Sequence, residues 1–441
     1  SNVGGGIWFG ENGGTTVLAN SKTISIGTGG FSSGEFRLQN FTQLGTTSQN
    51  ISLTGTAILR FKGSTVFNGN VNFDSPRVFI EGTTFNGSID IEKTGVSSDA
   101  STGGNTFVGN TIIRNSGSGY FMLANTNPDV FNGDVTMLNI GTNNMYLGNS
   151  SAGNSIAGNL TINNNPTGNG TIYLASSNTS SLNVTGNVDV YNNGAANSQN
   201  VYLSNEGDIT IGGNLLVENA MSGIVNSAQV FLANGSNASA VITGSTIIKN
   251  GGTKATSRVY LGNGGDVTFN GTLNIANSSV ATSSEVYCNH NANSSNIYNE
   301  NITVSSINSV NDGIYFGNST GTGVLASNKT ITTGVGGFAG RYLFLRNFTQ
   351  LGGLAQTIVL NGTARLELNN SDWGGNTDFT APTFYSRDSR YRGTAIFTKT
   401  GTTGDYSNGG NQFELDLTNY QLSLVEENKW FTNNSFTKFS F

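Results

Sequence analysis

Short triplets with an aromatic residue between two aliphatic residues recur along the middle of the chain. The aromatic residues of successive triplets lie 27 to 29 positions apart, and an eighth triplet, Ile7-Trp8-Phe9, lies near the start. A fixed period in the twenties is typical of solenoids. The alternation fits β-strands and not helices, so the pattern predicts coils of β-strand stacked on one another. The seven regular positions are Tyr146, Tyr173, Tyr202, Phe231, Tyr260, Tyr287 and Tyr315.

Each period contains two further apolar stretches. One follows the triplet, as in Ile209-Thr210-Ile211, and another follows a Gly-Asn pair, as in Leu160-Thr161-Ile162. Gly and Asn lie between the stretches, where a corner needs positive φ. We therefore predict an all-β fold, a parallel β-helix (β-solenoid) with about three short strands in each coil of about 28 residues. We expect the right-handed form.

Strand alternation also predicts which side chains lie inside. The residues on either side of each central aromatic are apolar and share one face, which we expect to be the core. The aromatic rings then point outward and stack from coil to coil. Such a ladder either stiffens the solenoid or lies under a corner loop, or it offers a platform to sugar rings or to a neighbouring solenoid. We also expect an amide ladder from the asparagines three positions further on: Asn149, Asn205, Asn234, Asn263 and Asn318.

A longer repeat lies over the short one. Residues 7–61 match residues 314–368 at a constant offset of 307, which becomes 306 in the sequence that follows. We therefore divide the chain into a first copy of the long repeat (1–135), regular coils (136–306) and a second copy (307–441). An enzyme with one active site gains little from such a duplication, whereas a stalk or filament gains length.

Composition narrows the choice of partners. Charged residues make up only 10% and the formal net charge is −6, so the chain lacks the basic footprint of a nucleic-acid-binding protein. The single cysteine allows no internal disulfide. No apolar run reaches the ~18 residues of a membrane-spanning helix, so we do not expect membrane insertion. The chain starts without a recognisable signal peptide and in mid-pattern, as expected of a piece of a longer protein. At its open ends we expect contacts with further coils of the same protein or with a surface or secretion protein.

No cluster of residues predicts a catalytic, cofactor or metal site. Cys288 falls in a column of leucines, where we expect it to be part of the core. His290 takes a corner position that is Asn in other coils. Asp208 and Asp266 each follow their aromatic by six positions and could bind Ca²⁺, but Asn237 occupies that place in the coil between them. Solvated corner charges are the simpler interpretation.

Arginines distinguish the second copy from the first. Arg387, Arg390 and Arg392 form a short basic stretch, and the matching residues 81–86 contain no arginine. Together with the arginines of 341–365 they give an acidic chain one basic region. This region is either a solvated face or a contact for an acidic polysaccharide or a neighbouring protein.

Several phrases resemble repeats of a known family. Residues 17–27 and 324–332, Asn40-Phe41-Thr42-Gln43 and Gly103-Gly104-Asn105-Thr106-Phe107 are similar to repeats in very large surface proteins of gliding Bacteroidota. These resemble gliding adhesins exported by type IX secretion. The resemblance implies an extracellular position on the outer membrane of a bacterial cell and a role in adhesion or gliding on polysaccharide. It implies no catalytic motif, and a type IX export domain is not evident.

These observations favour a non-catalytic structural and adhesive segment of a long extracellular surface filament. The alternative is a β-helical polysaccharide lyase or glycoside hydrolase acting on acidic glycans, which needs a pair of carboxylates. Asp372, Asp378 and Asp388 are its only candidate cluster. Binding of ice or mineral through threonine rows ranks last, because Thr23, Thr330 and Thr332 form no long array.

Overall fold

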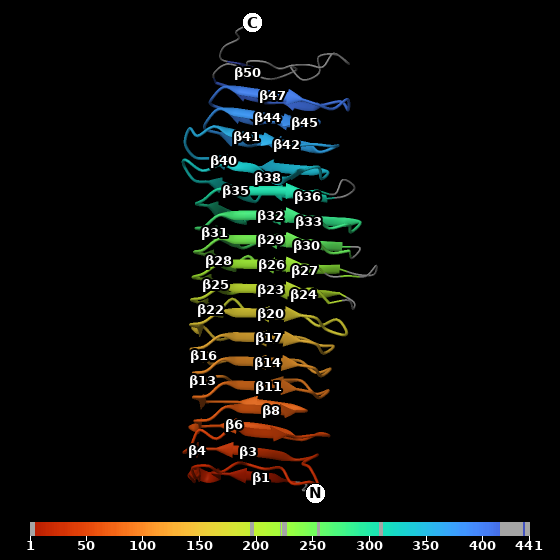
Figure 1. Cartoon of the computed structure of the whole chain (residues 1–441). Coiled ribbons are helices and arrows are strands. Elements are labelled where there is room, and N and C mark those ends of the chain that lie inside the picture. The colour runs from red at the N-terminus through yellow and green to blue at the C-terminus, as the bar shows by residue number, and fades with distance from the viewer. Residues whose placement is uncertain are drawn as a thin grey trace. The chain divides into compact units, whose positions relative to one another are not determined.

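The computed structural model describes residues 5–194, 198–220, 222, 227–253, 256–307, 312–414 and 435–436. These residues belong to two compact units, Ser1–Gly213 and Asn214–Phe441. In each unit almost all regular structure is β-strand, and every strand pair with a known register is parallel (Figure 1). The predicted all-β solenoid is confirmed for both units.

The first unit contains one short 3₁₀ turn, η1 (Glu11–Gly13), and 25 strands. In chain order they are β1 (Gly6–Phe9), β2 (Thr16–Leu18), β3 (Glu35–Gln39), β4 (Phe41–Gln43), β5 (Gln49–Ser52), β6 (Ile58–Lys62), β7 (Thr65–Phe67), β8 (Val71–Ser75), β9 (Arg77–Ile80), β10 (Thr83–Phe85), β11 (Ile89–Lys93), β12 (Asp99–Ala100), β13 (Thr106–Phe107), β14 (Thr111–Asn115), β15 (Phe121–Leu123), β16 (Val130–Phe131), β17 (Val135–Asn139), β18 (Met145–Leu147), β19 (Asn154–Ile156), β20 (Leu160–Asn164), β21 (Ile172–Leu174), β22 (Ser181–Val184), β23 (Val188–Asn192), β24 (Gln199–Tyr202) and β25 (Asp208–Ile211).

The second unit continues with the same kind of element. Its strands are β26 (Leu215–Asn219), β27 (Ser227–Leu232), β28 (Ser239–Ile242), β29 (Thr246–Asn250), β30 (Thr256–Leu261), β31 (Asp266–Phe269), β32 (Leu273–Asn277), β33 (Ser283–Cys288), β34 (Ser295–Tyr298), β35 (Ile302–Ser306), β36 (Asp312–Phe316), β37 (Thr322–Leu325), β38 (Ile331–Phe338), β39 (Tyr342–Arg346), β40 (Phe348–Gln350), β41 (Gln356–Val359), β42 (Arg365–Asn369), β43 (Asp372–Trp373), β44 (Thr377–Ala381), β45 (Thr383–Arg387), β46 (Arg390–Tyr391), β47 (Ala395–Lys399), β48 (Tyr406–Gly409), β49 (Gln412–Phe413) and β50 (Ser435–Phe436).

Three strands make one coil, as expected. In the regular part of the first unit, β18, β19 and β20 form one coil and β21, β22 and β23 form the next. Each strand pairs with its equivalent one coil later: β18 with β21, β19 with β22 and β20 with β23. The sequence repeat therefore places equivalent side chains directly above one another within each unit.

Coil length is less uniform than the sequence period suggested. Glu35 pairs with Ile58 and Ile58 with Arg77, so these coils contain 23 and 19 residues. Met145 pairs with Ile172, a coil of 27 residues. The expectation of about 28 residues in every coil is therefore wrong for the first copy of the long repeat. The strands keep their length there, and the corners between them are shorter.

The core lies where strand alternation predicted it. All fourteen residues that flank the seven regular aromatics have exposed fractions of 0 or 1%. Successive coils bring these residues into columns, for example Val259, Val286 and Ile314. The corner after each triplet takes positive φ, as expected, but three alanines, Ala124, Ala175 and Ala233, share this conformation with Gly and Asn.

A buried column of asparagines is a feature that the sequence pattern had not suggested to us. Asn164 donates to the side chain of Asn192 at 3.1 Å, and Asn250 donates to that of Asn277 at 3.0 Å. These asparagines have exposed fractions of 0 or 1%. Each follows two core residues at the same period of two, as in Leu160-Thr161-Ile162-Asn163-Asn164. That spacing was the available signal, because it puts the amide on the inner face. We call this column the inner asparagine ladder.

The two copies of the long repeat fold in the same way. Gln49 and Gln356, 307 positions apart, accept hydrogen bonds from the backbone N–H of Ile24 and Ile331 at 2.8 and 2.9 Å. Both donate to a backbone carbonyl two residues before that N–H, at 3.1 and 3.0 Å. The sequence repeat is thus also a repeat of individual contacts.

Candidate functional site

The predicted aromatic ladder is present within each unit. In the first unit the rings of Tyr146 and Tyr173 stack with centroids 4.9 Å apart, and those of Tyr173 and Tyr202 with centroids 4.8 Å apart. In the second unit Phe231, Tyr260, Tyr287 and Tyr315 stack at 4.7, 5.2 and 4.9 Å. Offset stacking of this kind adds ~0.5–1.5 kcal/mol per pair beyond burial. We refer to these residues as the outer aromatic ladder.

The ladder is less exposed than expected. Phe231 and Tyr260 are only 6% exposed, and the other five rings are half-buried. The correction has a physical reason: rings stacked at strand spacing cover one another's faces, so that solvent reaches mainly their edges. Burial accordingly raises the pKa of Tyr173 to about 12 and also raises the pKa of Tyr260. The middle of the ladder therefore offers no free ring face for a sugar to stack on.

Beyond Tyr315 the outer position changes in character. Phe344 stacks on Tyr315 at 5.1 Å, and the next two coils place Glu367 and Tyr385 in the same column. Tyr342 lies two residues before Phe344 and is half-buried beside it. This part of the face therefore has aromatic side chains that do not form one continuous stack.

Arginines lie over these aromatic rings. The guanidinium carbon of Arg341 is 4.7 Å from the ring centroid of Tyr342, and that of Arg365 is 4.6 Å from the same centroid on β42. Arg346 lies 5.2 Å from the centroid of Phe344. Arg387, at the end of β45, follows Tyr385 by two residues and has 44% of its side chain exposed. We define the arginine–aromatic patch as Arg341, Tyr342, Phe344, Arg346, Arg365, Tyr385 and Arg387.

The patch carries more positive than negative charge. Glu367, 5% exposed, pairs with Arg365 at 2.6 Å, and Asp388 pairs with Arg387 at 3.1 Å. Burial raises the pKa of Glu367 despite the attraction of Arg365. Within the described residues, neither Arg341 nor Arg346 has an ion-pair partner. Four arginines and two carboxylates leave a surface suited to an anion.

The structure separates the three arginines of the predicted basic stretch. Arg387 belongs to the patch, but Arg390 and Arg392 follow a corner and lie on or next to β46, in a different sheet. Arg390 forms an ion pair with Glu414, and Arg392 binds Asp372 with its Nε 2.8 Å from Oδ1. The prediction of one basic site is therefore wrong for Arg390 and Arg392, because the corner at Asp388 turns the chain onto another face.

The candidate carboxylates for hydrolysis are not gathered either. Asp372 is bound to Arg392 and Asp388 to Arg387, while Asp378 lies on β44 in a third sheet. A mechanism with paired carboxyl groups needs two of them to face one scissile bond. The three residues do not form such a pair.

The face of the first copy gives a direct comparison. At the positions of Tyr315, Phe344, Glu367 and Tyr385 it has Trp8, Arg37, Arg60 and Phe79. Arg37 and Arg60 both bind Glu35, at 2.9 and 2.6 Å, and Arg60 also reaches Glu81 at 3.3 Å. The arginines of the first copy are thus neutralised by neighbouring carboxylates.

Cys288 and His290 have structural surroundings. Cys288 is fully buried between Leu261 and Phe316, and burial raises the pKa of its thiol. The ring of His290 lies 4.3 Å from that of Tyr287, and its Nδ1 is 3.1 Å from the side-chain nitrogen of Asn318. Burial lowers the pKa of His290, so the neutral ring can accept a hydrogen bond from the amide.

His290 also occupies a place in the predicted corner ladder. Asn149 donates to Asn125 at 2.9 Å and Asn263 donates to Asn234 at 2.8 Å, so the amide ladder is confirmed at these positions. Asn205 instead donates to the backbone carbonyl of Ser176 at 3.1 Å. This ladder is only partly buried, whereas the inner asparagine ladder satisfies the buried groups.

The aspartates proposed for Ca²⁺ mark strand starts. Asp266 begins β31 and accepts a hydrogen bond from the backbone N–H of Ser295 at 2.7 Å. Its neighbour in the preceding coil is Ser239 and not Asn237, because the corner before β28 is two residues longer than assumed. Among the residues that the structure describes, no three His, Cys, Asp or Glu side chains are grouped to hold a metal ion.

Two further findings concern the whole described chain. None of the described elements is a helix long and apolar enough to cross a membrane. In comparisons with known proteins, no family model, no curated protein sequence and no solved structure matches this chain significantly.

Proposed function

We propose that this chain is a structural and adhesive segment of an extracellular bacterial surface filament, and that its arginine–aromatic patch binds acidic polysaccharide. The observation that carries the proposal is the excess of arginine over carboxylate among aromatic side chains on one face of the second unit. The resemblance of the repeats to those of gliding adhesins supports a position on the cell surface and a role in attachment and gliding.

The chemistry of the patch suits an acidic sugar chain. Arginine binds carboxylate or sulfate groups through two parallel hydrogen bonds, and its plane stacks on aromatic rings. Arg341, Arg346 and Arg365 are already held against rings, so less side-chain freedom is lost when an anion binds. The Nε atoms of Arg346 and Arg365 are buried without a hydrogen-bond partner.

The solenoid supplies the other requirement of an adhesin, which is a stiff support. Parallel strands, the inner asparagine ladder and the outer aromatic ladder repeat from coil to coil within each unit. A repeated framework of this kind can be lengthened without a change in its core. A sugar chain that runs along the strand stack would meet equivalent positions on several coils.

The proposal is tested by retention of the purified chain on immobilised polygalacturonate, with dextran as the neutral comparison. We expect retention on polygalacturonate without release of product. Replacing Arg341, Arg346 and Arg387 by alanine should weaken binding at least tenfold. The matched control replaces Arg114, Arg390 and Arg392, which changes net charge equally but removes arginines that are ion-paired elsewhere.

Equal weakening by both triple variants would show that only overall charge matters and would overturn the patch. Release of unsaturated or shortened sugars would overturn the non-catalytic proposal in favour of a lyase or hydrolase.

A further inference from the structure

The first coil of the first unit leaves part of its hydrophobic core uncovered. Ile7, Trp8 and Phe9 of β1 are 40, 45 and 38% exposed, and Val17 of β2 is 57% exposed. Within the described residues β1 has one strand partner, β3. We call residues 7–31 the open coil.

The second copy shows the same coil in a covered state. Ile314 and Phe316, which correspond to Ile7 and Phe9, are both fully buried. They pair on one side with β39, as Ile7 and Phe9 pair with β3, and on the other side with β33. The chain therefore contains its own control: the same strand with and without a preceding coil.

The third side of the open coil differs in the same way. Residues 331–338 form the eight-residue strand β38, which pairs with β35. The matching residues 24–31 form no strand. Both segments make equivalent hydrogen bonds to Gln49 or Gln356 in the coil that follows, so the missing neighbour is on the preceding side.

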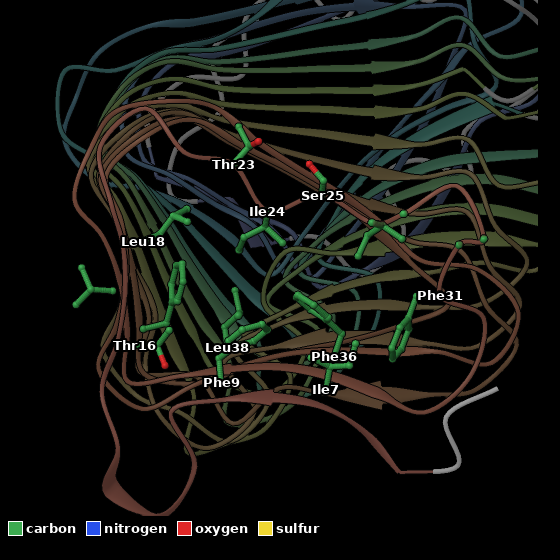
Figure 2. Close-up of a pocket in the computed structure, with 16 residues that line it drawn as sticks. Ile7, Phe9, Thr16, Leu18, Thr23, Ile24, Ser25, Phe31, Phe36 and Leu38 are labelled. Carbon is green, nitrogen blue, oxygen red and sulfur yellow. The ribbon is translucent and has the colours of Figure 1, made fainter. Parts of the chain in front are cut away.

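A cavity of about 630 Å³ lies at the mouth of the open coil. Figure 2 shows the side chains of Leu18, Ile24 and Phe36 pointing toward one another from different sides of the coil. Phe9 and Phe41 also line the cavity.

In the second copy, Tyr298 of β34 fills the corresponding space. Its ring is fully buried and lies 5.7 Å from that of Phe316 and 6.2 Å from that of Phe348. Phe316 and Phe348 correspond to Phe9 and Phe41 of the open coil. The cavity therefore has the surroundings that accept a large aromatic side chain in the second copy.

We infer that the open coil is a docking surface for a further parallel β-coil of the kind formed by Ser283–Ser306. In the register of the second copy, a residue equivalent to Val286 covers Ile7, one equivalent to Cys288 covers Phe9 and one equivalent to Ile302 covers Ile24. An aromatic residue equivalent to Tyr298 enters the cavity.

The backbone favours a coil over a small apolar ligand as the occupant. The edge of β1 that faces away from β3 presents N–H and C=O groups, and a parallel strand satisfies them at regular intervals. A small apolar molecule could fill the cavity but would leave these groups without strand partners. The inference concerns the first unit and does not depend on polysaccharide binding by the patch.

A chimera tests it. Residues 256–312 are placed directly before Gly6 of the full chain, so that Asp312 is followed by Gly6 as it is followed naturally by Gly313. We expect the amides of residues 7–9 and 24–26 to exchange with solvent at least 100-fold more slowly than in the parent chain. Binding of a fluorescent apolar dye should fall in parallel.

A matched control carries Val286→Asp and Tyr298→Asp in the added segment only. This control should protect neither set of amides. A second pair of variants separates docking from general folding: Ile7→Asp should have little effect on the parent, should abolish the protection in the chimera, and should then resemble Ile314→Asp in its effect on local exchange.

Unchanged exchange at 7–9 and 24–26 in the chimera would overturn the inference, whether or not the added coils fold. Equal protection by the Val286→Asp, Tyr298→Asp control would also overturn it. Dye that remains bound to the chimera at the parent's level would point instead to the cavity as a pocket for small apolar molecules.

Discussion

The two copies of the long repeat share their interior but differ on their outer face. Four positions of one inner column are aromatic and buried in both copies. In the first copy they are Phe41, Phe67, Phe85 and Phe107, and in the second they are Phe348, Trp373, Tyr391 and Phe413.

On the outer face, charge is rearranged. Glu35 corresponds to Tyr342, Arg60 to Glu367 and Glu81 to Arg387. Burial raises the pKa of Glu35, but hydrogen bonds from Arg37 and the charge of Arg60 lower it below its ordinary value. The pKa of Glu367 stays raised, since Arg365 does not compensate for its burial.

This difference shows which positions can vary independently. A core side chain contacts the coils before and after it, so any change there must fit two neighbours. An outer side chain contacts solvent on one side and can change its charge at low cost to stability. The core repeat therefore keeps the fold, and the outer positions are where binding properties differ.

The largest expected effect tests the shared interior. Phe67→Ala and Trp373→Ala should each destabilise their own coil by about 3–5 kcal/mol, because both remove a fully buried ring. Hydrogen exchange of β4, β7 and β10, or of β40, β43 and β46, measures the loss. Val66→Ala, on the outer side of the same strand as Phe67, should cost far less. Similar losses for Phe67→Ala and Val66→Ala would break the distinction between inner and outer positions.

A buried carboxyl should make the first unit sensitive to pH. Burial raises the pKa of Asp129 from 3.8 to about 7, so the folded state holds a proton that the unfolded state releases. Stability should therefore be highest below about pH 4 and fall as pH rises to about 7, by up to about 4 kcal/mol at ~1.4 kcal/mol per pH unit.

Asp129→Asn should flatten this dependence, since Asn105 and Asn154 already hydrogen bond to Asp129 from the adjacent coils. Unfolding by denaturant between pH 4 and pH 8, followed through exchange of β13, β16 and β19, provides the measurement. Stability that rises over this range in the unmodified chain would contradict the prediction.

A charge exchange sharpens the outer comparison. Arg387→Glu should weaken binding to polygalacturonate about tenfold, which is ~1.4 kcal/mol at 25 °C. The reciprocal Glu81→Arg removes the partner of Arg60 and should strengthen weak binding by the first copy. Both effects should shrink as salt is raised. Binding that responds to neither variant would place the contact elsewhere.

The smallest effect concerns the outer aromatic ladder. Tyr260→Leu removes stacking on Phe231 and Tyr287 and should cost ~0.5–1.5 kcal/mol per lost pair. Exchange of the amides of Val259 and Leu261 reports the change. Met122, which neighbours Tyr146 in the same column, shows that an aliphatic side chain fits this position. A loss above ~4 kcal/mol would mean that Tyr260 belongs to the core.

Much of the fold was predictable from local pattern. The alternation around Tyr202 or Tyr260 places Val201 and Leu203, or Val259 and Leu261, inside, and the structure confirms it. The same alternation placed Asn164 inside, but we had expected the amide ladder at the corner asparagines. Polarity alone was misleading there, because a buried amide is stable when amides above and below complete its hydrogen bonds.

The candidate site was less predictable. Arg387, Arg390 and Arg392 are close in sequence, yet a corner at Asp388 assigns them to two sheets. Arg341, Arg346 and Arg365 come from different coils and meet around Tyr342 and Phe344.

The sequence by itself determined the strand period, the inner and outer faces and the duplication of the long repeat, because these depend on alternation and spacing along one strand. Only the tertiary structure decided which outer side chains meet, how much of each ring is covered, and that one copy of a coil is open while the other is closed. These properties depend on corner length and on the neighbouring coil, which set contacts between residues roughly 20 to 30 positions apart.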